Sequence, residues 1–402
     1  MRDPMRFALV PAALALLACA AHAADQGGSI ETRLDGYPDG EPSIQAWFRG
    51  TYAFHAEPRP WLFARVVVHL EADSHGEISR DDLYDDDDRD LRRAASRFRD
   101  LALGFRGGGV TVVLGKQRLT WARASFVNAA DNLTPRDWTD PLDEVRLSPW
   151  AFDATWERGR WSVEGALVPR YAPSRLPQLG SRWLLPDADD LGVVWGPEVF
   201  PSVTWSNLQA GVRAGFRGAH GEARVSAFRG FDDAPRVAQA GTTLLRAFVP
   251  LDATAIDGEA LAGAWILRGE AGYFHFRDGS DGYGLYQVEA EWSRAPWHVT
   301  AGYGDAVGGD PATGIPAALD QGSLPAVFLR AYRGEATEWQ VALDAVVGTK
   351  EGDALVRLSA SYPWAGHLRA GMEVALMSGA ATTFWGRWRD NDRARLFLVA
   401  DF

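Results

Sequence analysis

Apolar and polar residues alternate with a period of two through much of the chain beyond residue 43. In the segment 354–362, one face carries Val356, Leu358, Ala360 and Tyr362, and the other carries Arg357, Ser359 and Ser361. The same pattern returns in the segments 337–347, 368–376 and 286–292. Successive side chains of a β-strand point to opposite faces, so the pattern predicts strands with one apolar and one polar face.

Strand length and aromatic placement separate the two folds that use such strands, a soluble sandwich and a transmembrane barrel. The segments run to about 9–11 residues, the span of a tilted membrane strand. Trp and Tyr recur at their ends, at Trp150, Trp161, Trp205, Trp292, Trp297, Trp339, Tyr362, Trp364 and Trp388. An aromatic belt at the lipid headgroups explains this placement. The sequence therefore predicts an all-β, transmembrane antiparallel β-barrel.

Eighteen segments have the strand pattern, an even number, as a closed antiparallel barrel requires. They are 43–54, 60–72, 96–106, 109–121, 149–158, 160–169, 203–217, 220–230, 241–251, 261–276, 284–294, 296–304, 325–334, 337–348, 352–362, 367–377, 381–389 and 393–402. One conflict remains, because counting back from Phe402 puts the turn 390–392 on the same side as the short turns. We expect one misassigned strand, with 231–262 as the candidate region, and any even number from 14 to 18 is compatible.

The two ends of the chain predict export. Residues 1–23 have a basic start, an apolar run and the cleavage motif Ala21-His22-Ala23, which is typical of a signal peptide. The alternative is a lipoprotein signal with Cys19 acylated. Residues 24–42 are predicted to form an N-terminal arm or a first short strand, and 43–402 the barrel. The last strand ends on Phe402, which resembles the C-terminal signature of Gram-negative outer-membrane barrels that the insertion machinery reads.

Composition excludes several other classes of protein. The formal net charge is −12, which argues against nucleic acid as a partner. Beyond the signal, no stretch approaches roughly 18 consecutive apolar residues, so helical membrane spans are not expected. The histidines are scattered, and no HExxH, G-x-S-x-G or phosphate-binding loop is present. We therefore expect no enzyme activity and no cofactor.

Long polar connections are predicted at 73–95, 117–148, 170–202, 231–243 and 305–324. The first contains Asp85, Asp86, Asp87 and Asp88, which fit a solvated acidic loop better than a divalent-cation site because their spacing matches no EF-hand. The loop 170–202 is rich in proline and contains Trp183 and Trp195. It either folds inward as a cap or stands outside as a rigid loop.

The loop 117–148 and the polar strand faces supply the candidate pore residues. From the loop and the strand before it come Lys116, Arg118, Arg123, Asp131, Asn132, Arg136 and Asp137, and from the strands come Arg213, Arg268, Glu270, Arg357 and Arg369. Charged rings inside a pore select permeant solutes. Opposite charges can instead pair across the lumen and brace the wall, and both interpretations stay open.

Four motifs carry a resemblance to a known family. Leu114-Gly115-Lys116-Gln117-Arg118 followed by Trp121 resembles the "GRQ…WG" strand of porin-like outer-membrane barrels, including the alginate-export type. The segment 131–138 resembles their "TDNLxPRDY" loop, 267–274 a later "LRGEAAYF" strand, and 389–393 the last hairpin. The chain departs from the motif at Ala122, where the family has glycine, and at Arg123, where it has lysine.

The resemblance implies a multi-pass barrel in the outer membrane of a Gram-negative cell. Its expected function is a channel or porin that passes or exports a polar or anionic solute or polymer through a charged lumen constricted by loop 117–148. The alternative is a non-conducting barrel that acts as a structural or assembly partner with a plugged lumen. Expected partners are outer-membrane lipid and lipopolysaccharide, the insertion machinery through Phe402, and a small solute or polysaccharide.

Overall fold

The structure is a computed structural model of the chain. It describes residues 24–39, 42–79, 83–85, 88–90, 92–143, 145–178, 180–184, 192–196, 200–309, 323–334 and 338–402. The predicted signal peptide with Cys19, and the acidic residues Asp86 and Asp87, lie outside these residues.

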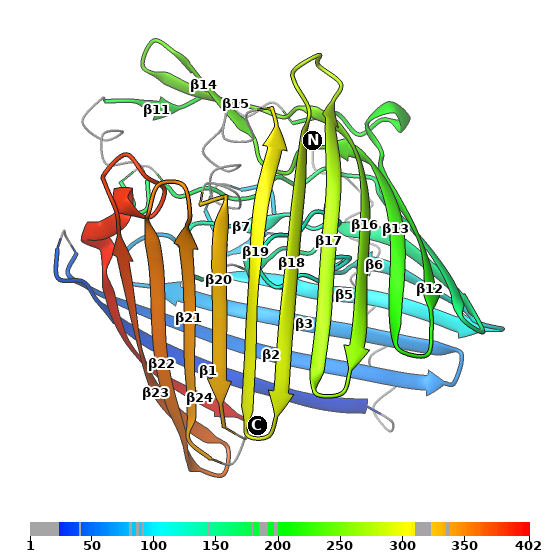
Figure 1. The fold of residues 1–402 in the computed structure, drawn as a ribbon, viewed down its shortest axis with the longest axis horizontal. Helices are drawn as coiled ribbons and strands as arrows, with labels where there is room; N and C mark the ends of the chain where they lie inside the picture. The colour runs from blue at the N-terminus through cyan, green and yellow to red at the C-terminus, as the bar shows by residue number, and fades with distance from the viewer. Residues whose placement is uncertain are drawn as a thin grey trace.

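The described residues form one large antiparallel barrel (Figure 1). The main sheet contains 19 strands, of which β4 (Tyr84–Asp85) is a loop segment parallel to β5, and the others form the wall. The 18 wall strands are β1 (Ala24–Gly36), β2 (Ile44–Arg59), β3 (Leu62–Asp73), β5 (Ser96–Gly107), β6 (Val110–Lys116), β9 (Trp150–Arg158), β10 (Trp161–Val168), β12 (Gln209–Arg217), β13 (Gly221–Phe231), β16 (Pro250–Ala262), β17 (Trp265–Phe276), β18 (Tyr283–Arg294), β19 (Trp297–Gly308), β20 (Ala326–Arg333), β21 (Gln340–Gly348), β22 (Ala354–Ala365), β23 (Leu368–Ser378) and β24 (Arg393–Asp401). Because β1 pairs with both β2 and β24, the barrel is closed.

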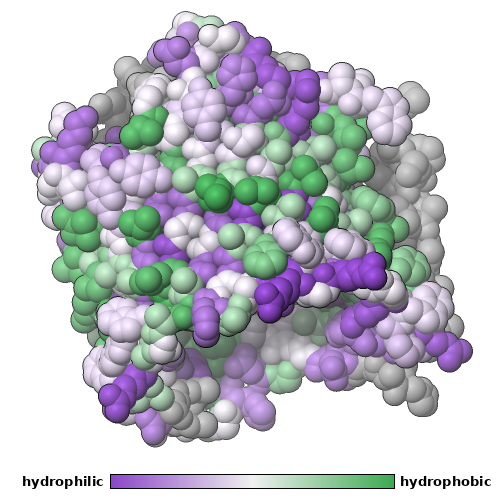
Figure 2. Space-filling model, turned by 45° about the vertical axis from the view of Figure 1, so that its right-hand side comes forward, coloured by the Kyte–Doolittle hydropathy of each residue, from purple (hydrophilic) through white to green (hydrophobic). Residues whose placement is uncertain are grey.

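The two faces of the wall differ as the alternation predicts. On β21, Val341 and Val347 are exposed on the outer face, whereas Asp344 points inward beside Arg357 of β22. Trp161, Trp265 and Trp297 begin strands at the end with short turns and are about half exposed, as an aromatic belt requires. Figure 2 shows hydrophobic residues gathered in the middle of one face, with hydrophilic residues above and below. The outer surface is therefore suited to a bilayer.

Short turns join strands at one end of the barrel, and long loops join them at the other (Figure 1). Turns such as 108–109 and 159–160 connect β5 to β6 and β9 to β10. All five predicted long connections leave from the opposite end. Both chain ends of the barrel, the start of β1 and the end of β24, lie at the turn end, where the Phe402 nitrogen donates to the Gly28 carbonyl at 2.9 Å.

Two predicted strands are wrong and two wall strands were missed, so the predicted number was right only by compensation. Residues 241–251 contribute β15 (Thr243–Ala247), which pairs with β14 (Arg236–Ala240) and β11 (Val194–Trp195) in a small sheet outside the wall. Residues 381–389 overlap the 3-10 helix η2 (Gly386–Asn391) and form no strand. This also removes the conflict about the side on which the turn 390–392 lies.

The wall strands that are absent from the eighteen predicted segments are β1 and β16. Residues 24–36 form a strand of the wall, as the alternative to an arm predicted, so the barrel begins at residue 24 rather than 43. The outer face of β1 contains Gln26, Gly28 and Thr32, which weakens its apolar signal. In the strand β16, Asp252 lies on the outer face and interrupts the alternation in the same way.

The remaining described elements are small. The pair β7 (Arg136–Asp137) and β8 (Val145–Arg146) lies within the loop 117–148, and the 3-10 helix η1 (Trp205–Asn207) precedes β12. No helix in the described parts of the chain is long and apolar enough to cross a membrane.

Candidate functional site

The inner loop, defined here as residues 117–148 without the undescribed residue 144, starts from a sharp bend at the end of β6. Gly115 has a φ of 127°, and a Cβ there would lie 2.1 Å from the carbonyl oxygen of Leu101, so the bend requires glycine. Lys116 is buried next to it, and its Nζ lies 2.7 Å from Oδ2 of Asp88. The loop therefore leaves the wall in a fixed direction.

One buried carboxylate on the wall fastens two parts of the inner loop. Glu270 of β17 points inward, and its Oε2 accepts hydrogen bonds from the backbone nitrogens of Arg123 at 3.1 Å and Ala124 at 3.3 Å. Its Oε1 accepts one from the nitrogen of Ala130 at 2.7 Å. Since amides separated along the loop share this carboxylate, the loop must fold back against the inner face of β17.

The adjacent strand β18 continues this contact. Gln287 accepts from the nitrogen of Val127 at 2.5 Å, and Glu289 accepts from the nitrogen of Ser125 at 2.9 Å. The Nη1 of Arg268 lies 2.9 Å from Oε1 of Glu289, which holds that carboxylate in position. Polar side chains of the wall therefore satisfy the backbone of the loop where it has no secondary structure of its own.

Charged side chains of the loop bind the neighbouring strands. The guanidinium of Arg123 lies 2.8 Å from Glu222 of β13, and 3.0 Å from both Asp257 and Glu259 of β16. The structure therefore places Arg123 among wall carboxylates.

Trp121 anchors the first part of the loop on β10 and β12. Its Nε1 donates to Oε1 of Glu164 at 2.6 Å, and Arg213 donates to the Trp121 carbonyl at 3.0 Å. Arg213 also lies 2.5 Å from Oε2 of Glu164. Gly211 lies below the ring, and a Cβ there would come within 2.6 Å of it, so the close approach depends on glycine.

An apolar cluster fills the space between this part of the loop and the wall. It contains Leu119, Trp121, Val127, Ala129, Ala130 and Leu133 from the loop, and Ala151, Ala166, Val168, Phe228, Val249, Leu251, Ala253, Phe274, Phe276, Tyr283 and Leu285 from the wall and its adjoining segments. Burial of this kind is worth about 25 cal/mol per Å² of apolar surface. The cluster therefore holds residues 119–133 as a packed layer against β9 to β18.

The other end of the loop is bound to the seam of the barrel. Arg393 of β24 lies 2.8 Å from Asp140, while Arg395 of β24 and Arg33 of β1 each lie 2.7 Å from Asp143. Burial raises the pKa of Asp140 to about 6, although Arg393 opposes the shift. Burial also favours a raised pKa for Asp143, but Arg395, Arg393 and Arg33 outweigh it and hold that pKa well below its ordinary value.

Asp137 is the centre of a buried ion-pair cluster at the loop end of the barrel. Its carboxylate is 2.8 Å from Arg93 and 3.2 Å from Arg175, with Arg97 of β5 at 3.9 Å. The side chain is fully buried. Burial would raise the pKa of Asp137, but the charges of Arg93 and Arg175 reverse the effect and hold it well below its ordinary value.

The structure gives most of the predicted pore residues a partner in the protein. Arg268 also meets Glu291 at 2.8 Å, Arg357 donates to the carbonyl of Leu142 at 2.9 Å, and Arg369 donates to Gln340. Within the loop, Asp131 pairs with Arg146, Asn132 donates to the Ala129 carbonyl, and Arg136 lies over the ring of Trp138. These contacts link the loop to the wall or neighbouring parts of each to one another. Arg118 differs, because its side chain is exposed.

The interpretation of residues 85–88 as part of a solvated acidic loop is wrong for the two residues that the structure describes. Asp85 and Asp88 are buried, and both lie within 3.2 Å of Nη2 of Arg175. Asp88 also binds Lys116. The carboxylate oxygens of Asp85 and Asp88 already form ion pairs with Arg175 and Lys116, so a metal ion would have to displace a lysine or an arginine.

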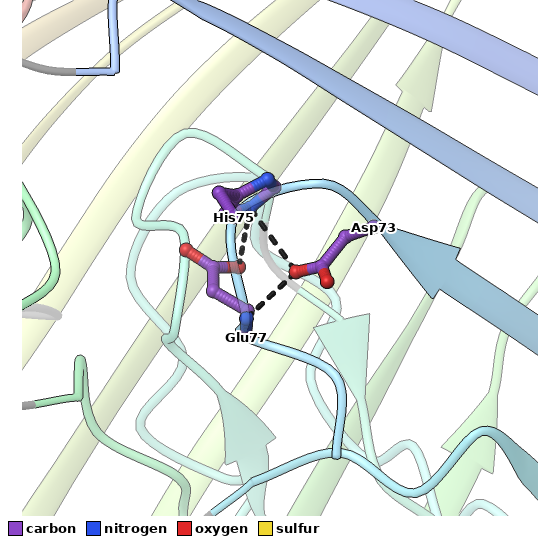
Figure 3. A group of neighbouring side chains, drawn as sticks. All are labelled: Asp73, His75 and Glu77. Atoms are coloured by element: carbon purple, nitrogen blue, oxygen red, sulfur yellow. Dashed lines mark hydrogen bonds and ion pairs between the residues drawn. The ribbon is translucent and has the colours of Figure 1, made fainter. Parts of the chain in front are cut away.

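A second group of acidic residues could hold a cation. Asp73, His75 and Glu77 follow β3, and their candidate ligand atoms lie within 4.8 Å of one another (Figure 3). The Nε2 of His75 is 3.4 Å from Asp73 and 3.5 Å from Glu77. Burial alone would lower the pKa of His75, but the hydrogen bond to Glu77 and both carboxylates raise it above its ordinary value. The group therefore favours a protonated histidine.

A cavity of about 410 Å³ separates the inner loop from one side of the wall. The loop side carries Ser125, Phe126, Trp138, Leu142 and Asp143, and the wall side carries Thr300, Phe328, Arg330, Asp344 and Arg357 of β19 to β22. Phe126 stacks on Phe328 with ring centres 5.2 Å apart. The cavity is therefore both aromatic and charged.

The sequence reasoning missed several of these residues. Arg330 and Phe328 lie on the inner face of β20, and the period of two could have identified them. The same signal marks Arg393 and Arg395, which are two residues apart on β24. Arg93 and Arg175 belong to loops without periodicity, so no local signal could have joined them to Asp137.

No protein-family model and no curated protein sequence matches the chain. Among solved structures, OccAB4 of Acinetobacter baumannii is similar at 8% identity with a TM-score of 0.56, over 94% of this chain and 98% of that one. A BenF-like porin from Pseudomonas fluorescens is similar at 9% identity with a TM-score of 0.54, over 95% and 98% of the two chains. At these identities, the likeness shows the fold.

The fold is that of the outer-membrane barrel porins, with 18 antiparallel strands in a closed wall. The chain is accordingly a multi-pass β-barrel of the outer membrane, which agrees with its apolar outer face. The resemblance to the alginate-export type is not confirmed, because no family model matches.

Proposed function

We propose that the protein is an outer-membrane channel through which small polar anionic solutes pass between the inner loop and strands β19 to β22. The observation that carries this proposal is the cavity of about 410 Å³ at that place. Ligand pockets for small molecules span about 300–1,000 Å³. The inner loop thus narrows the lumen on the side of β9 to β18 and leaves a passage on the opposite side.

The charges along this side support an anionic solute. On the wall side, Arg330 and Arg357 face the cavity with one carboxylate, Asp344, which lies 2.5 Å from Arg330 and 3.7 Å from Arg357. Asp143, on the loop side, lies 2.7 Å from both Arg33 and Arg395, so its charge is already paired. The wall side of the cavity therefore carries an excess of positive charge. Positive charge that lines a narrow polar passage raises the local concentration of anions.

A second cationic group lies at the start of the inner loop. Arg65 of β3 and Arg99 of β5 lie 3.6 and 3.2 Å from the same carboxylate, Asp100. Partial burial, with the charge of nearby Arg99 adding to it, lowers the pKa of Arg118. Three guanidiniums with one carboxylate favour anions here as well.

The size of the cavity bears on the export of a polymer, which the alginate-type resemblance suggested. A passage of about 410 Å³ that is lined by stacked rings fits a single small molecule. A polysaccharide would have to thread this cavity as an extended chain, past the stacked rings of Phe126 and Phe328. The geometry therefore favours a small solute over a polymer.

The packing of the inner loop supports a second candidate, a non-conducting barrel that serves as a structural or assembly partner. The apolar cluster and the hydrogen bonds to Glu270 fix the loop inside the lumen, where it can block the passage of solutes. In this alternative, the cavity beside β20 and β21 is closed above or below. Electrical measurements separate the two functions.

The purified protein in a planar lipid bilayer is expected to give ohmic current steps with an anion-selective reversal potential in a potassium chloride gradient. Arg118→Gln should lower the anion preference, because it removes an exposed guanidinium from the lumen. Arg389→Gln, which changes a half-exposed arginine in η2, is the matched control and should leave the preference unchanged. Silent bilayers with correctly folded protein would contradict the channel and support the plugged barrel.

A further inference from the structure

A row of polar residues crosses the outer face of the wall near the loop end. Arg229 of β13 is paired in register with Asp252 of β16, and Asp252 is paired with His275 of β17. Exposed apolar or aromatic residues lie two or four positions away on the same faces, namely Val225, Ile256 and Tyr273. The row therefore points toward lipid and not into the lumen.

In this row, the carboxylate of Asp252 forms ion pairs with the guanidiniums of Arg229 and Arg277. Nε of Arg229 lies 3.9 Å and Nε of Arg277 lies 3.5 Å from Oδ1 of Asp252. Arg277 follows the last residue of β17, and its Nη2 donates to the Gly230 carbonyl at 2.7 Å. The Arg229 side chain is 68% exposed, so most of its donors face outward without a partner in the described structure.

The position of the row along the strands sets it at the level of lipid headgroups. Arg229 is two residues from the end of β13, and Asp252 is two residues from the start of β16. Tyr273 lies two residues deeper on β17, where an aromatic belt is expected. A charged side chain on the lipid face is tolerated only near the interface. Outward arginines such as Arg294 and Arg333 lie at the opposite, turn end of the wall.

We propose that Arg229 and Arg277, with His275 beside them, bind a phosphate group of a phosphorylated glycolipid in the outer leaflet. Arginine recognises phosphate through paired, charge-assisted hydrogen bonds. Two arginines against one aspartate leave a net positive charge for the phosphate. The apolar surface directly below, around Ile256 and Tyr273, receives the acyl chains of the same lipid. This contiguity selects a lipid over a free phosphate ion.

The test measures retention of a lipid by the full-length protein in detergent, with native mass spectrometry as the readout. The probes are bisphosphorylated lipid A and the same lipid with its phosphates removed. The wild type should retain the phosphorylated lipid, and the double variant Arg229→Gln with Arg277→Gln should bind it about tenfold more weakly. The matched control, Arg294→Gln with Arg333→Gln, changes two outward arginines at the turn end and should bind like the wild type.

A third variant separates recognition from folding. Asp252→Asn removes the competing negative charge but keeps an acceptor for both arginines, so it should bind the phosphorylated lipid at least as tightly as the wild type. Equal retention of both lipids, or full retention by the double arginine variant, would overturn the proposal. Displacement of the lipid by an equal concentration of inorganic phosphate would overturn the assignment to a lipid. Because the row lies outside the lumen, conductance should not change in any of these variants.

Discussion

Replacing Asp137 with alanine is expected to lower the free energy of unfolding by about 3–5 kcal/mol, the cost of breaking a buried ion pair. The substitution leaves Arg93 and Arg175, both almost fully buried, without their shared carboxylate. It also removes the acceptor for the backbone nitrogen and hydroxyl of Thr139. Urea unfolding of the protein in detergent measures the change, and proteolysis of the inner loop should become faster.

The effect of Asp137 on stability has a characteristic pH dependence. Its pKa in the folded protein lies well below 3.8, so it contributes stability above the unfolded pKa that is lost as pH falls through the folded value. The difference between wild type and Asp137→Ala should therefore be constant above about pH 4 and shrink only in stronger acid. Asp390→Ala, at a side chain that is 76% exposed, is the control. A loss below about 1 kcal/mol for Asp137→Ala would show that the arginines find other partners.

Replacing Glu270 with alanine is expected to release the inner loop from the wall and to increase the conductance and its noise. The substitution leaves the backbone amides of Arg123, Ala124 and Ala130 without an acceptor, and each buried amide left unpaired costs about 1–3 kcal/mol. The loop recovers part of this cost by moving into the water of the lumen. Single-channel recording in a planar bilayer measures the result.

Two variants serve as controls for Glu270→Ala. Glu270→Gln keeps one carbonyl acceptor, so its conductance should lie between those of the wild type and the alanine variant. Glu57→Ala removes a carboxylate of β2 that pairs with Arg106 near the turn end and is 42% exposed. That change should leave the current unchanged. A Glu270→Ala channel with wild-type conductance would contradict a role for this carboxylate in fixing the loop.

The sequence predicts the wall better than the interior. Alternation located β17 to β23 because the middle parts of their outer faces are apolar, as in the series Met372, Val374 and Leu376. It missed β16, where Asp252 occupies an outward position that a lipid-facing strand normally gives to an apolar residue. That exception follows from its place near the headgroups, where a charge is tolerated.

The path of the inner loop could not be predicted from the sequence. Its contacts join residues far apart along the chain, such as Ala130 with Glu270 and Asp140 with Arg393. No local period encodes such pairs, because the loop has almost no regular structure and takes its hydrogen bonds from the wall. The motif containing Asp137 identified the right segment, but its buried cluster with Arg93 and Arg175 depends on two other loops.

The central claim is that solutes pass between the inner loop and β20. The most direct test is to modify a cysteine in that passage and to measure whether the current falls. The one cysteine of the sequence, Cys19, lies in the predicted signal, so a cysteine introduced at Arg330 provides the thiol to be modified. An anionic thiosulfonate reagent should reduce the current of Arg330→Cys, because Arg330 lines the cavity. Val288→Cys, on the lipid face of β18 and 54% exposed, should not respond. An unchanged current through modified Arg330→Cys would place the conducting path elsewhere and contradict the account.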